Sequence, residues 1–160
     1  MNIYNRLLQS EKYRQLVKTL EKEEEDRAYC RHGLSHFLDV ARIAYIENLE
    51  RGLGISKDYI YSTALLHDIG RLNAYKDYEI HEEASTVLAE ELLLECGCDD
   101  SDIREITAAV FNHGNRYVEN DNSLSGLIYR ADKASRYCAF CDSFEDCKWS
   151  EERKNAEKSI

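Results

Sequence analysis

The chain of 160 residues contains no proline. Glycine, the other common helix breaker, occurs at only seven positions: 33, 52, 54, 70, 97, 114 and 126. Proline and glycine are the residues least compatible with a helix interior, so a chain this poor in both favours long helices. No segment shows the apolar–polar alternation of a β-strand. We therefore expect an all-α protein, a single-domain helical bundle.

Apolar residues at helical spacing divide the chain into about six main helices. We expect them at roughly 4–27, 34–49, 57–69, 79–96, 100–113 and 123–140. Ser56 is a suitable N-cap for the third, and glycines follow the second to fifth helices closely. Residues 112–122 form a polar loop, and the charged tail from 142 to 160 can carry a short last helix. The length suits one domain over residues 1–160.

The balance of charge restricts the partners of the protein. Arginine and lysine total 21 against 31 acidic residues, a net charge of −10. Binding to a long nucleic-acid backbone needs a basic surface, so we do not expect it. A small anion remains possible because a bound metal can invert the local field. No secretory signal and no membrane-length apolar run occur, so we expect a cytoplasmic protein without a membrane partner.

Five histidines, at 32, 36, 67, 81 and 113, carry the main functional signal. A lone histidine on an apolar stripe is usually a packed core residue. Here His36, His67, His81 and His113 extend the stripes of four different predicted helices, so each should face the interior. Helical bundles build metal sites from such facing side chains. A metal would also remove the cost of burying unpaired imidazoles, about 1–3 kcal/mol each.

Two aspartates add carboxylate ligands to this set. Asp68 follows His67 near the end of its helix, and Asp132 lies one turn after Ile128. Adjacent residues diverge by about 100° on a helix, so His67 and Asp68 can share an ion only if it lies over the helix end. Imidazole with carboxylate suits Fe, Mn, Zn or Ni, whereas oxygen alone suits Mg or Ca. We expect one or two divalent transition metal ions.

Three segments resemble the motifs of the HD-domain superfamily of metal-dependent phosphohydrolases: HFLDVARIA (36–44), ALLHDIGR (64–71) and RADKASR (130–136). The resemblance covers about residues 30–136. It implies that His36, His67, Asp68 and Asp132 bind one ion. EIHEEAS around His81 and FNHGN around His113 are similar to the extra histidines of the binuclear branch, which includes bacterial HD-type diadenosine tetraphosphatases. That similarity implies a second ion that shares Asp68.

The resemblance implies phosphoryl hydrolysis by a metal-activated water. Arg71, Lys133 and Arg136 flank the ligands and would stabilise the developing charge. Alternatively, Arg71 is a solvated helix-end charge and Arg136 a surface residue. His32, four residues before His36, would share its face if the helix began early, and would then contact substrate or donate a proton.

The expected partner is a small phosphorylated substrate, with a nucleotide and in particular a dinucleoside polyphosphate as the leading candidate. A homodimer is also possible. Two other functions fit the same ligands: a metal- and nucleotide-binding sensor without turnover, and a di-iron oxygenase of the HD type.

The segment from 137 to 160 contains three of the six cysteines, in the pattern C-x2-C-x5-C: Cys138, Cys141 and Cys147. The first pair has the spacing of a zinc site, which would need a fourth ligand from Cys30, Cys96 or Cys98. We favour the alternative, in which these are reduced thiols that pack the last helix.

Overall fold

The computed structural model describes residues 1–73 and 80–156, and the helices within these ranges confirm the expected all-α class. The described part holds no β-strand. Its α-helices are α1 (Ile3–Gln9), α2 (Glu11–Glu23), α3 (Leu34–Glu50), α4 (Lys57–Leu66), α6 (His81–Glu95), α7 (Asp100–Asn112) and α8 (Leu124–Ala134). Two 3-10 turns, η1 (Arg116–Val118) and η2 (Cys138–Phe140), follow α7 and α8. The predicted start of the fourth helix, at residue 79, lies outside the described residues.

The first predicted helix, over 4–27, is two helices that meet at Ser10. Ser10 has an extended backbone, and its hydroxyl accepts a hydrogen bond from the Tyr13 N–H at 3.3 Å, so it caps α2. The Asp58 carboxylate accepts the backbone N–H groups of Ile3 and Tyr4 at 3.0 and 3.2 Å. These contacts dock α1 on the start of α4. The prediction of one continuous helix was therefore wrong, because a serine cap interrupts the apolar pattern.

The last predicted helix, over 123–140, ends early, at Ala134. The Ser135 hydroxyl donates to the Asp132 carbonyl at 2.7 Å, and the Asn155 amide donates to the carbonyls of Lys133 and Arg136 at 2.6 and 3.1 Å. These side chains satisfy carbonyls that a longer helix would have used internally. The described tail, residues 141–156, consists of turns and bends, so the predicted short last helix is absent from it.

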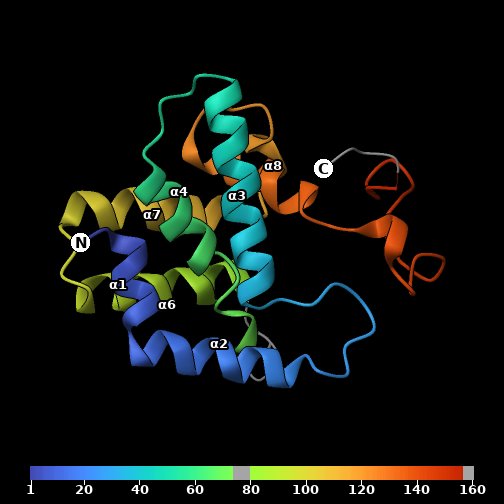
Figure 1. Cartoon of the computed structure of the whole chain (residues 1–160), viewed down its shortest axis with the longest axis horizontal. Helices are drawn as coiled ribbons and strands as arrows, with labels where there is room; N and C mark the ends of the chain where they lie inside the picture. Colours follow the sequence, from blue (N-terminus) through green and yellow to red (C-terminus); the bar gives the residue numbers. More distant parts are fainter. Residues whose placement is uncertain (74–79, 157–160) are drawn as a thin grey trace.

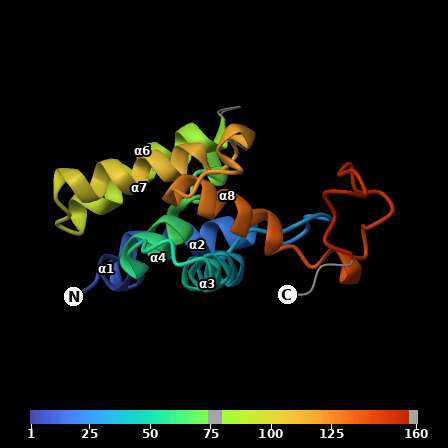
Figure 2. The same cartoon turned by 90° about the horizontal axis from the view of Figure 1, so that it is seen from above.

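Helix α4 lies at the centre of the fold and is buried along most of its length. One apolar cluster packs α1, α2, α6 and α7 against the end of α4, and a second packs α3, α7 and α8 against its other faces. Figure 1 shows α3 standing across the α6–α7 pair, and Figure 2 shows that pair on one side of the molecule with α1, α4 and α3 on the other. The ends of α3, α4, α6, α7 and α8 are thereby brought towards one region.

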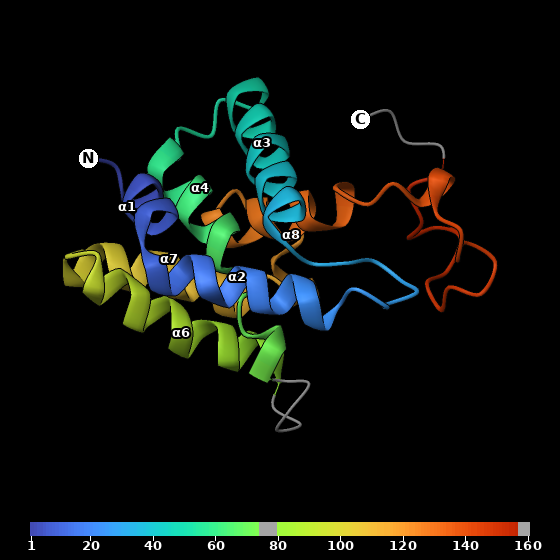
Figure 3. The same ribbon diagram turned by 60° about the horizontal axis from the view of Figure 1, so that its bottom comes forward.

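The tail after α8 extends away from the helices, beside the connection between α2 and α3 (Figure 3). Hydrogen bonds between described residues join these segments. The Ser143 hydroxyl donates to the Ala28 carbonyl at 2.6 Å, and the Tyr29 hydroxyl donates to the Asp146 carbonyl at 3.3 Å. Among the described residues, no helix has both the length and the apolar character that a membrane span requires.

Candidate metal centre

Helix ends, rather than helix middles, supply most of the candidate ligands. Helix α4 ends at Leu66, three residues before the predicted end, and His67 and Asp68 occupy the turn that follows. His113 directly follows α7, and His81 begins α6. His67 still has helical backbone angles, φ −59° and ψ −34°. His67 and Asp68 nevertheless approach one point, with Nε2 and Oδ2 3.4 Å apart, because both lie at the end of the helix.

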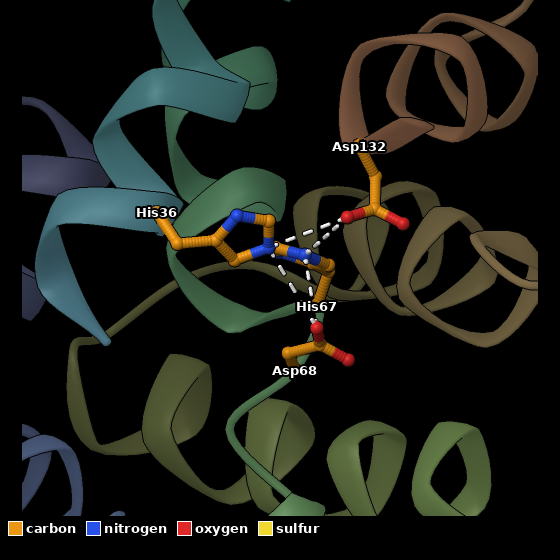
Figure 4. Close-up of side chains that lie close together, drawn as sticks. All are labelled: His36, His67, Asp68 and Asp132. Carbon is orange, nitrogen blue, oxygen red and sulfur yellow. Dashed lines mark ion pairs between the residues drawn. The ribbon is translucent and has the colours of Figure 1, made fainter. Parts of the chain in front are cut away.

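The first group of donors consists of His36, His67, Asp68 and Asp132, whose ligand atoms all lie within 4.8 Å of one another. The Nε2 atoms of His36 and His67 lie 3.8 and 3.4 Å from Oδ2 of Asp68, and 3.3 and 3.7 Å from Oδ1 of Asp132. Figure 4 shows the four side chains converging from α3, the turn after α4, and α8. Such a group could hold one ion.

The second group consists of Asp68, His81 and His113, again within 4.8 Å. Here the other carboxylate oxygen of Asp68 takes part: its Oδ1 lies 3.5 Å from Nε2 of His81 and 3.3 Å from Nε2 of His113. Asp68 therefore presents one oxygen to each group. This is the arrangement that a carboxylate bridging two metal ions requires.

Each of these histidines uses its Nδ1 atom elsewhere. The Nδ1 atoms of His67 and His113 lie 2.7 and 2.6 Å from the carbonyls three residues earlier, of Ala64 and Val110. The carbonyl can only accept, so Nδ1 carries the proton and Nε2 its lone pair. In the same way Nδ1 of His36 contacts the Ser135 hydroxyl at 3.4 Å, and Nδ1 of His81 contacts Glu82 at 3.1 Å. This orientation is typical of metal-binding histidines.

The site contains buried polar atoms that a cation would satisfy. Among the described residues, Nε2 of His36, His67 and His113 and Oδ2 of Asp68 are buried without a hydrogen-bond partner, while Oδ1 of Asp68 has the Arg71 guanidinium at 2.8 Å. Leaving such atoms unpaired costs about 1–3 kcal/mol each, and more when the group is charged. In this tautomer a nitrogen lone pair faces a carboxylate oxygen, and a divalent cation between them converts repulsion into attraction. The donor set therefore fits Fe, Mn, Zn or Ni.

Burial sets the protonation of most of these groups. It lowers the pKa of His67, that of His32 to about 4 and that of His81 to about 3, which favours the neutral imidazole that metals bind. Burial also opposes ionisation of Asp68, but Arg71 and the surrounding histidines outweigh it and hold the Asp68 pKa well below its usual range. At His113 the Asp68 carboxylate overcomes burial and raises the pKa.

All three predicted cations contact the ligand carboxylates. Nε of Arg71 lies 2.8 Å from Asp68, while Lys133 and Arg136 lie 2.6 and 3.0 Å from Asp132. The Arg136 side chain is only 8% exposed, so the alternative of a surface residue was wrong. Arg71, 18% exposed, pairs with a buried carboxylate, so it is not simply a solvated charge.

His32 reaches the centre by a route that the sequence did not indicate. It precedes α3, which starts at Leu34, so the early helix start that would have placed it on one face with His36 does not occur. It is nevertheless buried, and its Nε2 lies 3.5 Å from Oδ2 of Asp68. Glu24, a buried carboxylate that the sequence analysis missed among seven consecutive charged residues, holds its Nδ1 at 2.9 Å. No local pattern distinguishes Glu24 from its neighbours.

The cysteines divide into two places. Cys30 joins Cys138, Cys141 and Cys147 around one pocket, whereas Cys96 and Cys98 lie at the far end of α6, near Arg6. Within the described ranges, no three of these sulfur atoms lie within 4.8 Å of one another, and all six thiols are free. The thiols do not pack a last helix, because α8 ends before them.

Comparisons with known proteins identify the family of the chain. The family model described as HD domain matches residues 33–137, about two thirds of the chain. A protein of Clostridium beijerinckii, described as uncharacterized, is 41% identical over 155 residues, which cover 97% of each chain. No solved structure gives a significant match. The family match spans the helices that carry His36, His67, Asp68, His81, His113 and Asp132, and the chain belongs to the HD-domain family of metal-dependent phosphohydrolases.

Proposed function

We propose that this protein hydrolyses a phosphate ester or anhydride of a small nucleotide, with two metal ions that share Asp68. The observation that carries the proposal is the orientation of the Asp68 carboxylate. Its Oδ2 faces His36 and His67, and its Oδ1 faces His81 and His113. A site for a single ion would not need the second pair of buried or half-buried histidines. The resemblance to diadenosine tetraphosphatases makes a dinucleoside polyphosphate the leading substrate.

The metal ligands and their supports would act as one unit. A pair of divalent cations, when bound, supplies a nucleophile at neutral pH by lowering the pKa of water and neutralises phosphate charge. His36, His67 and Asp132 would hold the first ion, and His81 and His113 the second. Lys133 orients Asp132 through its ion pair. Arg71 and Arg136 pair with the carboxylates and also line an adjoining pocket, so they can reach phosphate oxygens there.

His32 would accept rather than donate a proton. Burial lowers its pKa to about 4, so it is neutral at neutral pH, and a neutral ring whose Nδ1–H donates a hydrogen bond to Glu24 has a free lone pair at Nε2. That nitrogen faces Asp68 at 3.5 Å, and the residue lines the adjoining pocket. We propose that His32 orients the attacking water. This differs from the role of proton donor that we considered from the sequence.

Metal content tests the two-ion arrangement. We expect the purified protein to bind two ions per chain, His81→Ala to bind about one, and His36→Ala also to bind fewer than two. The matched control is His32→Ala, because His32 is the one histidine outside both donor groups. An unchanged stoichiometry in His81→Ala would assign that residue to packing.

A panel of phosphorylated compounds tests the reaction. The metal-replete protein should release phosphate or a nucleotide from at least one phosphoester or phosphoanhydride, and Asp68→Ala should abolish that release while the fold survives. A metal-replete protein that leaves the whole panel intact would favour a sensor. Turnover that requires oxygen, with an electron paramagnetic resonance signal from iron, would favour an oxygenase.

A further inference from the structure

Two pockets adjoin the candidate metal centre and share a wall. The first, of about 310 Å³, is lined by His32, Arg71 and Arg136, so it reaches the carboxylates of the centre. The second, of about 300 Å³, lies beside it. Tyr29, Cys30, Arg136, Cys147 and Trp149 line both. Each has the size of a small-molecule site, and together they suit a ligand with two chemically different parts.

The first pocket is lined by cationic side chains, two of which, Arg71 and Arg136, also pair with Asp68 and Asp132 of the centre. Arg27, Arg71, Arg136 and Lys148 line it, and among the described residues no aspartate or glutamate does. This contrasts with a whole chain whose net charge is −10. A local concentration of positive charge in an acidic protein attracts a small polyanion to that one place. The lining matches a chain of phosphates that extends outward from the metal centre.

The second pocket is aromatic. Tyr29, Tyr137, Phe144 and Trp149 line it, and Tyr29 is 46% exposed. Arg136 lies 5.6 Å from the centre of the Trp149 ring, at the wall that the two pockets share. Flat, partly exposed aromatic rings bind nucleobases by stacking, with little dependence on which base is present. The cationic pocket, which suits phosphates, and the aromatic pocket, which suits a base, therefore lie side by side.

Much of this wall lies outside the HD-domain match, which covers residues 33–137. Lys148 and Trp149 belong to the tail, while Arg27 and Tyr29 belong to the connection between α2 and α3. The hydrogen bonds of Ser143 to Ala28 and of Tyr29 to Asp146 hold these two segments together. The Asn155 amide ties the tail back to the end of α8. The tail is therefore placed as one side of the pockets.

We propose that the tail and the 27–31 segment form the substrate-recognition wall of the enzyme, and that they bind a nucleoside polyphosphate. The phosphate chain lies in the cationic pocket, where Lys148 contacts the phosphates distal to the metal centre. The base lies in the aromatic pocket against Tyr29. This assignment rests on the proposed phosphohydrolase function, because it names the substrate class of the same site.

Calorimetry on the metal-replete, full-length protein tests the assignment without turnover. The probes are the analogue of ATP in which methylene groups replace both bridging oxygens of the triphosphate chain, and the matching bis-methylene analogue of inorganic triphosphate, which lacks a base. Tyr29→Leu should raise the Kd of the ATP analogue about tenfold, as expected for a lost stacking contact, and leave that of the triphosphate analogue unchanged. Lys148→Ala should raise both Kd values about threefold, because an exposed charge contributes modestly.

Matched variants separate stacking from other effects. Tyr29→Phe keeps the ring and loses only the hydroxyl, and Ser143 and Asn155 still tie the tail in place, so this variant should bind the ATP analogue as the wild type does. Tyr117→Leu, at a tyrosine 95% exposed on η1, and Lys18→Ala, at an exposed lysine on α2, should change neither Kd. The chain has one tryptophan, Trp149, so its fluorescence should change when the ATP analogue binds.

The assignment is overturned if Tyr29→Leu leaves the Kd of the ATP analogue unchanged, or if it raises the Kd of the triphosphate analogue equally. A protein that binds the ATP analogue as described but hydrolyses nothing would refute the proposed function alone. A protein that hydrolyses phosphoesters but binds the ATP analogue no better than the triphosphate analogue would refute this inference alone.

Discussion

Replacing Gly70 by alanine should separate α6 from the metal centre. Gly70 lies in the turn that carries His67 and Asp68, and it packs directly on the backbone of α6. A Cβ atom there would lie 2.1 Å from the Ser85 nitrogen and 2.4 Å from the Ala84 carbonyl carbon. Ordinary contact begins at 3.4 Å, so the two backbones would have to part by about 1.3 Å. Neither neighbour is a side chain that could rotate away.

Two costs add in this variant. Forcing a methyl group into a packed interface costs about 1–3 kcal/mol. Parting the backbones also breaks the hydrogen bond that the Gly70 N–H donates to the Ser85 hydroxyl at 2.9 Å, and a buried donor left unpaired costs about 1–3 kcal/mol. We therefore expect Gly70→Ala to lower the free energy of unfolding by about 3 kcal/mol or more. This is a large part of the 5–15 kcal/mol typical of a domain.

The same shift should weaken the second metal position. His81 begins α6, one turn before Ser85, and its Nε2 lies 3.5 Å from Oδ1 of Asp68. Metal–ligand bonds tolerate only about 0.2 Å of error, so a movement of α6 should reduce the affinity for the ion held by His81 and His113. The ion held by α3, α8 and the turn after α4 should be affected less.

Urea unfolding and metal analysis check both effects. Ser85→Ala removes the hydrogen bond without the clash, so it should cost less than Gly70→Ala. Gly52→Ala should cost about 1–2 kcal/mol, because Gly52 has a φ of 61° and nothing within 4 Å, and it should not change metal content. A Gly70→Ala variant no less stable than Ser85→Ala, with both ions retained, would refute the reasoning.

Three further variants test other contacts. Asp68→Asn should lower metal content at both positions, measured by elemental analysis, whereas Glu91→Gln, at a surface partner of Lys12, should change nothing. Ser10→Ala should lower the free energy of unfolding by about 1 kcal/mol through loss of the α2 cap, and an unchanged value would argue against the break between α1 and α2. Tyr13→Phe should cost about 1 kcal/mol at neutral pH, because the Tyr13 hydroxyl donates to the Leu65 carbonyl at 2.9 Å. Burial raises the Tyr13 pKa strongly, so the wild type should lose stability as pH rises above about 10, where an unfolded tyrosine ionises, and the phenylalanine variant should lose less. If the wild type and the phenylalanine variant lose the same free energy of unfolding as the pH rises, that assignment is contradicted.

Local patterns in the sequence were enough for the fold class and for the set of candidate ligands. Apolar residues at helical spacing and the lack of proline predicted helices close to α3, α4 and α7. Histidines at the ends of apolar stripes predicted inward-facing imidazoles, and the structure brings His36, His67, His81 and His113 into two groups around Asp68. These inferences succeed because each depends on contacts within one helix.

The breaks in the helices depended on contacts that the spacing of residues does not show. The separation of α1 from α2 needs Asp58 on α4 to receive the start of α1, and the end of α8 needs Asn155 from the tail. The helical spacing of apolar residues predicted that both helices continue, the first past Ser10 and the last past Ser135. Serines at 10 and 135 were the available local signals.

The sequence determines part of the chemistry of the site, and the tertiary structure determines the rest. The sequence alone determined that imidazoles and carboxylates would meet in a helical core, because their spacing relative to the apolar residues is a local property. Only the tertiary structure decided that each Asp68 oxygen faces a different pair of histidines, that Glu24 holds His32, and that Arg136 is buried against Asp132. The Asp68 contacts join residues up to 45 positions apart, Asp68 and His113. They depend on how the helices pack, which no single stretch of sequence specifies.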